Sequence, residues 1–139
     1  MVSKKPKKQR RDIRDAPVHV RQSRMGSPLH PELREKYGRR TAVVRKGDLV
    51  KVMRGGSSGH VGKVVKIDTR RHRITVEKMT LTKADGKQVE KWVDPSNVMI
   101  VKPDLSDRWR RRKLGKAAET DFEKEAAKAA GGEEEEAVE

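Results

Sequence analysis

The large apolar residues of this chain are gathered in one central stretch, and that distribution most constrains what it can fold into. Residues 43–102 hold most of the Val, Ile, Leu and Met, whereas residues 1–28 have very few large apolar side chains. A segment with so little apolar surface cannot offset the entropy of its own ordering. The sequence therefore predicts a single small folded unit with long extensions at both ends.

Charge divides the chain in the same way. Residues 1–46 have 15 Lys and Arg against 4 Asp and Glu, a net charge of +11. The net charge is +6 over residues 47–103, +4 over 104–116 and −7 over 117–139. Ahead of the acidic end, residues 1–116 therefore have a net charge of +21. Such an excess points to a polyanionic partner.

Five short strands are expected in the apolar stretch, because apolar and polar residues alternate there. The expected strands are residues 48–54, 63–67, 73–78 with a continuation through Leu81, 89–93 and 98–101. The side chains expected to face the core are Val50, Val52, Val65, Ile67, Ile74 and Val76. Asp85-Gly86 predicts a type I′ hairpin turn. Short strands joined by tight turns favour a small antiparallel barrel, because closure removes exposed edges.

Two helices are expected beside the strands. Pro31 at the start and Gly38 as a stop residue predict a helix over residues 31–37. Thr120 and Glu123 have capping-box spacing ahead of an Ala-rich stretch, although a helix with so few large apolar residues is marginal alone. The expected segments are a basic N-terminal arm (1–28), a short helix and lead-in (29–45), the barrel (46–103), a basic C-terminal segment (104–116) and a mobile acidic tail (117–139).

Several functional classes find no support in the sequence. The chain has no Cys, so disulfides, thiolate metal sites and Cys nucleophiles are excluded. Its four His lack metal-ligand spacing, and we expect no metal and no cofactor. No apolar run approaches the roughly 20 residues that span a bilayer, so no membrane partner is expected. No nucleophile–base pattern or phosphate-binding Gly-Lys loop is present, so we expect neither an enzyme nor a small-molecule substrate.

One motif combines the strands with a Gly-rich loop. A Gly47-Asp48-x-Val50 strand is followed by glycines over residues 55–62, by Lys63-Val64-Val65 and by a third alternating strand. This pattern resembles the KOW motif of ribosomal proteins and transcription elongation factors, which implies a mainly β fold with an SH3-like barrel. Glycines let a backbone come close to a phosphate-ribose chain, although the loop can also be a simple flexible hairpin.

The flanking segments resemble one family of large-subunit ribosomal proteins. Residues 27–45, 94–100 and 105–113 resemble the universal family numbered twenty-four, whose eukaryotic member is numbered twenty-six. The resemblance covers about residues 10–115, and the long basic N-terminus brings it closer to archaeal and eukaryotic members. It implies a cytoplasmic structural constituent of the large ribosomal subunit. Such a protein binds the 5′ region of large-subunit rRNA, acts early in assembly, lies near the peptide tunnel exit and contacts neighbouring ribosomal proteins.

The candidate rRNA-binding residues are the exposed cations and the Gly-rich loop. The alternatives are a solubilising tail for the N-terminal cations, and a packing anchor for the Trp109 side chain instead of base stacking. The full set is Lys4, Lys5, Lys7, Lys8, Arg10, Arg11, Arg14, Arg21, Arg24, Arg39, Arg40, Arg54, Gly55, Ser57, Ser58, Gly59, His60, Gly62, Lys63, Arg108, Trp109, Arg110, Arg111 and Arg112.

Two other classes of protein compete with the rRNA-binding interpretation. A transcription elongation factor with a KOW domain would need a separate α/β domain for polymerase, and the residues before Lys46 are too few for it. A DNA-compacting basic protein would show no preference for folded rRNA.

Overall fold

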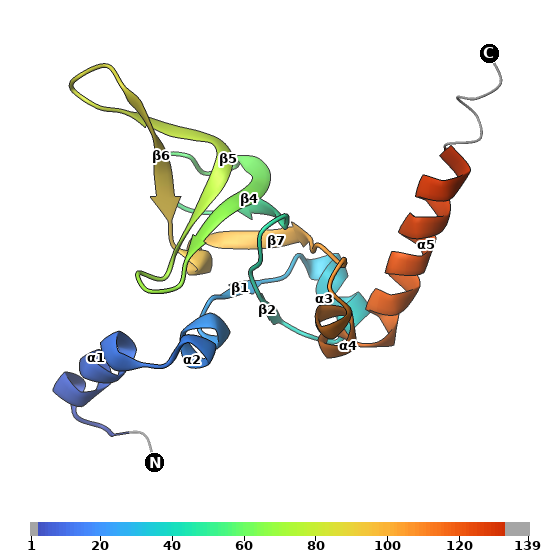
Figure 1. Ribbon diagram of the computed structural model, residues 1–139, viewed down its shortest axis with the longest axis horizontal. Coiled ribbons are helices and arrows are strands. Elements are labelled where there is room, and N and C mark those ends of the chain that lie inside the picture. Colours follow the sequence, from blue (N-terminus) through green and yellow to red (C-terminus); the bar gives the residue numbers. More distant parts are fainter. Residues whose placement is uncertain (1–2, 133–139) are drawn as a thin grey trace.

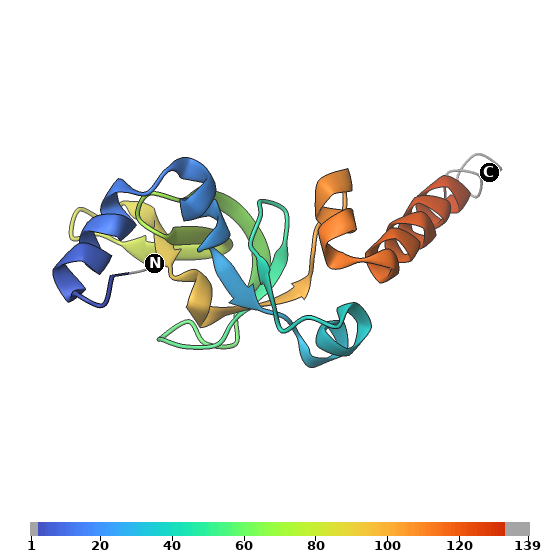
Figure 2. The ribbon, with the colours of Figure 1, turned by 90° about the horizontal axis from the view of Figure 1, so that it is seen from below.

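The computed structural model describes residues 3–132, and Figure 1 shows a β-sheet body with helices at both ends. The elements are α1 (Pro6–Asp15), α2 (Val18–Ser23), β1 (Gly26–Pro28), α3 (Pro31–Tyr37), β2 (Thr41–Val43), β3 (Leu49–Val52), β4 (Val61–Asp68), β5 (Arg73–Thr82), β6 (Gln88–Val93), the 3-10 helix η1 (Pro95–Asn97), β7 (Val98–Lys102), α4 (Arg108–Leu114) and α5 (Lys116–Gly132). Figures 1 and 2 both place α1 and α5 at opposite ends of the molecule.

The body is a five-stranded antiparallel sheet in the order β6-β5-β4-β3-β7. This confirms the mainly β, SH3-like fold. Within residues 3–132, β6 and β7 are the two ends of that order and do not pair with each other, so the expected closure is not found. Register shifts interrupt the β3–β7, β4–β5 and β5–β6 pairings. Such irregularities bend strands, and here they accompany the curl of the sheet around its core.

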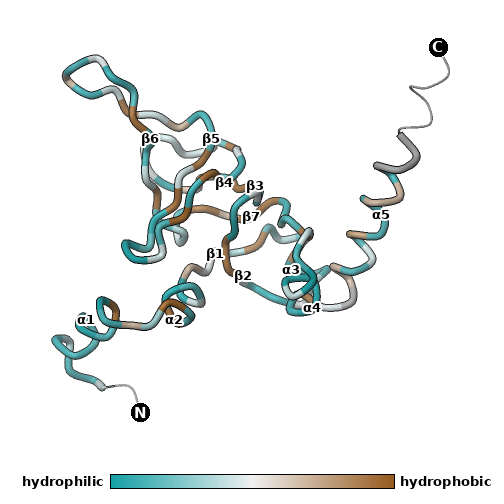
Figure 3. Tube along the Cα trace, in the orientation of Figure 1, coloured by the Kyte–Doolittle hydropathy of each residue, from teal (hydrophilic) through white to brown (hydrophobic). Residues whose placement is uncertain are grey.

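The strand pattern predicted most of the core, with one error. Val50, Val52, Ile74 and Val76 are buried as expected. Val65 is 40% exposed, however, while its neighbour Val64 is only 3% exposed. The register shift between Val64 and Lys66 moves the alternation by one residue, so the inward position predicted for Val65 was wrong. Figure 3 shows hydrophobic stretches in the sheet and mostly hydrophilic helices.

The predicted hairpin exists, but its turn is of another type. Gly86 has a φ of 75°, whereas Asp85 is not in the positive-φ region. Gly86 N donates to Lys83 O at 2.9 Å, and Lys83 N donates to Lys87 O at 2.9 Å. A type I′ turn needs two residues with positive φ, and a three-residue loop needs only one, which the glycine supplies.

The folded unit begins earlier than the apolar stretch suggested. β1 pairs with β2, and Leu29 forms an isolated bridge with Ile100. Met25 and Leu29 are only 1% and 0% exposed. The end of the expected arm is therefore part of the core, whereas α1 contributes no buried residue. Two short strands and two apolar side chains were too weak a signal to detect in a basic segment.

The helix α3 ends as predicted, and the helix in the acidic tail differs from expectation. Gly38 follows α3 with a φ of 62°. α5 begins at Lys116, and Thr120 lies inside it with its hydroxyl donating to Ala117 O at 2.9 Å. Ala118 is completely buried, so the start of the expected mobile tail is docked on the body. Residues 133–139 lie outside the described residues. No helix in the described part is long and apolar enough to cross a membrane.

Candidate nucleic-acid interface

The Gly-rich loop, residues 53–60, connects β3 to β4, and its own hydrogen bonds fix its shape. Val52 N donates to His60 O, and Gly59 N donates to Val52 O, both at 2.8 Å. Gly55 and Gly59 have φ values of 93° and 88°, a region that favours glycine. A Cβ at either position would meet nothing within 4 Å. The outer backbone of this loop is therefore open to close approach by a ligand.

Three polar side chains of the loop are engaged inside the protein. Ser58 Oγ donates to Met53 O at 3.0 Å, and Ser57 Oγ accepts a hydrogen bond from a β6 lysine at 2.9 Å. His60 Nε2 lies 2.8 Å from Glu77 O, which fits a hydrogen on that nitrogen. The predicted contacts through Ser58 and His60 would therefore require these hydrogen bonds to be exchanged.

Gly62 serves the packing of two strands. A Cβ at Gly62 would lie 2.8 Å from Val76 Cγ1 and 3.1 Å from Glu77 O. Its backbone does not adopt a positive φ, so the close approach of β5 is what requires glycine. The exposed charges nearby come from Arg54 in the loop and from Lys63 in β4.

The helix α4 begins at a carboxylate cap. Asp107 Oδ1 accepts a hydrogen bond from Trp109 N at 3.0 Å, which satisfies one of the donors at the helix start. Arg45 also donates to the Asp107 carboxylate. This hydrogen bond, together with those from the α4 backbone, lowers the pKa of Asp107 below its ordinary value. The cap and the ion pair fix the start of α4 against the segment after β2.

Arg110, predicted to contact RNA, is part of the core. It is 5% exposed, and its guanidinium forms two hydrogen bonds with the completely buried Asp48. Nη1 lies 2.5 Å from Asp48 Oδ1, and Nη2 lies 2.6 Å from Oδ2. A guanidinium held in this bidentate way cannot also hold a phosphate at the surface. The prediction for Arg110 is corrected to a structural role.

The other members of the basic C-terminal segment lie nearer the surface. Trp109 is 67% exposed, so it does not anchor the segment, and its ring can stack on a partner. Arg108 and Arg112 are exposed, and the Arg112 guanidinium lies 5.8 Å from the Trp109 ring centroid. Arg111 is half-buried, and its guanidinium lies 3.9 Å from the Phe122 ring centroid on α5.

The N-terminal cations form a second basic surface, spread over α1 and its flanks. Arg24 Nη2 lies 2.6 Å from Asp12 Oδ2, and Arg21 Nη2 donates to Arg14 O at 3.1 Å, so α1 folds back towards α2. The Arg14 hydrogen bond lowers the pKa of Asp15. The predicted residues that are exposed here are Lys4, Lys5, Lys7, Lys8, Arg10, Arg11, Arg14 and Arg24; exposed Arg39 and Arg40 follow α3.

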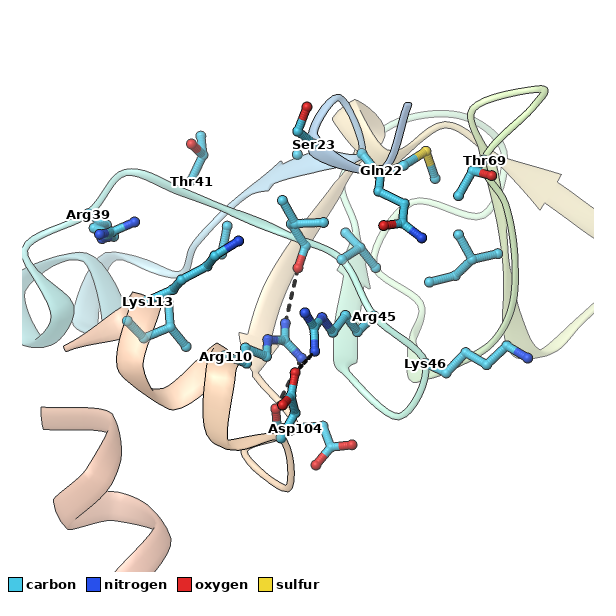
Figure 4. A pocket seen from close by; sticks show the side chains of 18 of the residues that line it. Gln22, Ser23, Arg39, Thr41, Arg45, Lys46, Thr69, Asp104, Arg110 and Lys113 are labelled. Atoms are coloured by element: carbon cyan, nitrogen blue, oxygen red, sulfur yellow. Dashed lines mark hydrogen bonds and ion pairs between the residues drawn. The ribbon is translucent and has the colours of Figure 1, made fainter. Parts of the chain in front are cut away.

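A groove between α2, β2 and α4 adds residues that the sequence did not single out. It encloses about 790 Å³, and its lining includes Arg39 together with Arg45, Lys46 and Lys113 (Figure 4). Arg39 was among the predicted residues, whereas nothing but charge distinguished Arg45, Lys46 and Lys113 in the sequence. No group of three or more metal-ligating side chains occurs in residues 3–132.

Known proteins match most of this chain. A family model described as the ribosomal proteins L26 of eukaryotes and L24 of archaea matches residues 3–117. The large ribosomal subunit protein uL24 of Methanothrix thermoacetophila is 50% identical over 107 residues, which cover 77% of this chain and 92% of that protein. The large ribosomal subunit protein uL24 of Saccharolobus solfataricus is 45% identical over 117 residues, covering 84% and 98%.

These matches define the class as ribosomal proteins, a structural rather than an enzymatic class. The chain belongs to the family of eukaryotic L26 and archaeal L24 ribosomal proteins, which confirms the resemblance in the KOW motif and its flanks. The family match ends at residue 117, so nearly all of α5 lies beyond it.

Proposed function

We propose that this protein is a structural component of the large ribosomal subunit that binds rRNA in its 5′ region and helps to begin subunit assembly. Support comes from the names of its relatives and from the position of its cations. Its place would be near the peptide tunnel exit, in cytoplasmic ribosomes and against neighbouring large-subunit proteins. The observation that carries the proposal is the exposure of basic side chains on separate surfaces of one small body.

Three surfaces would contact the RNA. The first is α1 with its flanks, the second is the Gly-rich loop with Arg54 and Lys63, and the third is α4 with Arg108, Trp109 and Arg112. Because they belong to different parts of the body, they can contact different RNA helices and neutralise the repulsion between them. Recognition would depend mainly on shape, since the major groove of A-form RNA is too narrow for side chains to read.

The test compares the full-length protein on rRNA of the 5′ region and on random-sequence duplex DNA over a salt series. We expect tighter binding to the rRNA, with an affinity that falls steeply as salt rises. Equal affinity for the two nucleic acids at every salt concentration would refute the proposal in favour of a DNA-compacting protein.

A charge-matched pair of variants tests the α4 surface. Combining Arg108→Ala with Arg112→Ala should weaken rRNA binding and reduce the salt slope by about 1 for each phosphate that the protein no longer neutralises. The control combines Lys124→Ala with Lys128→Ala, two exposed α5 residues beyond the family match, with the same loss of charge. An equal decrease of affinity in both variants would show that net charge, and not the α4 surface, determines binding.

A further inference from the structure

The groove between α2, β2 and α4 has polar ends and a floor that is partly apolar. Figure 4 shows Arg39, Thr41 and Lys113 at one end and Gln22, Thr69 and Lys46 at the other. The lining also includes exposed Val43 and buried Val44. These residues come from elements far apart in the sequence, so the groove exists only in the folded protein.

The lining holds the Asp104 carboxylate, which accepts a hydrogen bond from Ser106 N at 3.0 Å, and its other charged side chains fall into two sets. In the middle, Arg110 is paired with Asp48 and Arg45 with Asp107, so these groups already have partners. The side chains at the two ends are different. Within residues 3–132, six side chains of the lining make no hydrogen bond or ion pair with another residue. They are those of Gln22, Arg39, Thr41, Lys46, Thr69 and Lys113. Three cations and three neutral polar groups without partners thus line this concave space.

The size of this space and the chemistry of its lining indicate the kind of ligand that it can bind. A volume of about 790 Å³ is in the range of small-ligand pockets and is far too small for an A-form duplex. The cations suit phosphates, and the carboxamide of Gln22 has both donors and an acceptor, as a base edge requires. The side chain of Val43 offers an apolar surface for the face of a base.

We propose that the groove holds an unpaired nucleotide of the bound RNA. One flanking phosphate lies near Arg39 and Lys113, the other lies near Lys46, and the base edge meets Gln22 and Thr69. This inference rests on the proposed function in that the nucleotide belongs to the rRNA, and it adds a single-stranded contact to binding that otherwise depends on shape.

The first experiment titrates the full-length protein with a short single-stranded RNA and, separately, with a blunt-ended RNA duplex of the same composition. Amide chemical shifts are followed by NMR. The single strand should move the amides of Thr41, Thr69 and Gln22, and the duplex should leave them in place. Equal shifts with the duplex, or no shift of these amides with the single strand, would overturn the proposal without any mutation.

The second experiment fills the groove without changing charge. Thr41→Trp places an indole at its rim, and Thr80→Trp on exposed β5, outside the groove, is the matched control. Affinity for the 5′ rRNA should fall about tenfold in Thr41→Trp, in line with the removal of one well-made base interaction. Equal affinity of the two variants would overturn the proposal.

The two proposals can fail separately. If the wild-type protein prefers the rRNA over duplex DNA but Thr41→Trp binds as well as Thr80→Trp, the groove proposal is wrong and the proposed function stands. If the single strand moves the groove amides but rRNA and DNA bind equally, the groove binds RNA strands and the proposed function is wrong.

Discussion

Replacing Arg110 with Ala should lower the free energy of unfolding by about 3–5 kcal/mol, the cost of leaving a buried ion without its partner. The Arg110 side chain donates twice to Asp48 and also to Asp104 O at 3.0 Å and Val43 O at 3.2 Å. After its removal, the buried Asp48 carboxylate would keep only two backbone donors, Arg45 N and Asp104 N, each at 2.8 Å. Two backbone hydrogen bonds do not neutralise a buried carboxylate, so most of that cost remains.

The assay is equilibrium denaturation in urea, followed by circular dichroism. Since a domain is typically stable by only about 5–15 kcal/mol, the decrease would be a large fraction of the total. The melting temperature should fall by on the order of 10–20 °C. The control is Arg112→Ala, which removes the same charge from an exposed position of α4 and should cost less than about 0.5 kcal/mol. Coincident denaturation curves for the two variants would refute the structural role of Arg110.

A double-mutant cycle isolates the ion pair from the rest of the side chain. Asp48→Ala combined with Arg110→Ala should destabilise the protein by less than the sum of the single changes, because the second change removes a charge that the first had left unpaired. If the two effects simply add, the interaction with Asp48 is not what Arg110 contributes.

Local geometry supports three further predictions. Gly62→Ala should cost about 1–3 kcal/mol in a thermal melt because its Cβ overlaps β5, whereas Gly56→Ala, with nothing within 4 Å and no positive φ, should be nearly neutral. The lowered pKa of Asp107 means that its pairing with Arg45 stabilises the protein fully at neutral pH. That stability declines as pH falls through the ordinary value of 3.8 and is lost below the lowered one, so Asp107→Asn should be less sensitive to acid in this range. Deleting residues 117–139 should leave rRNA affinity unchanged or raise it, because the deleted segment is acidic and pairs with basic side chains of the body. A marked decrease of affinity in a binding assay would show that this segment contacts RNA.

The strands could be predicted because their signal is local. Alternation of side chains along β3 and β5 identifies inward residues such as Val50 and Ile74, whatever the partner strand is. Val65 was misplaced because a register shift depends on how β4 meets β5, which is not visible within one strand. The pairing of β1 with β2 was missed for the same reason: three-residue strands are determined by the body on which they lie.

The four arginines of α4 show most clearly what could not be predicted from the sequence alone. Arg108, Arg110, Arg111 and Arg112 are neighbours in the chain and were all predicted to contact RNA. In the structure they range from exposed through half-buried to buried, because a helix turns each side chain to a different side. Arg110 is the buried one because it pairs with Asp48, which lies 62 positions earlier in the chain. Only the fold brings the two residues together.

The same buried pair also explains how the groove accommodates several basic side chains. Asp48 holds Arg110, and Asp107 holds Arg45, so the two arginines in the middle of the groove are neutralised and fixed. Without these carboxylates, five basic side chains would share one small concavity and repel one another. Because Arg110 also joins α4 to the sheet, it holds the helix that brings Lys113 to the groove wall. Stability of the body and the arrangement of the groove's cations therefore depend on one buried interaction.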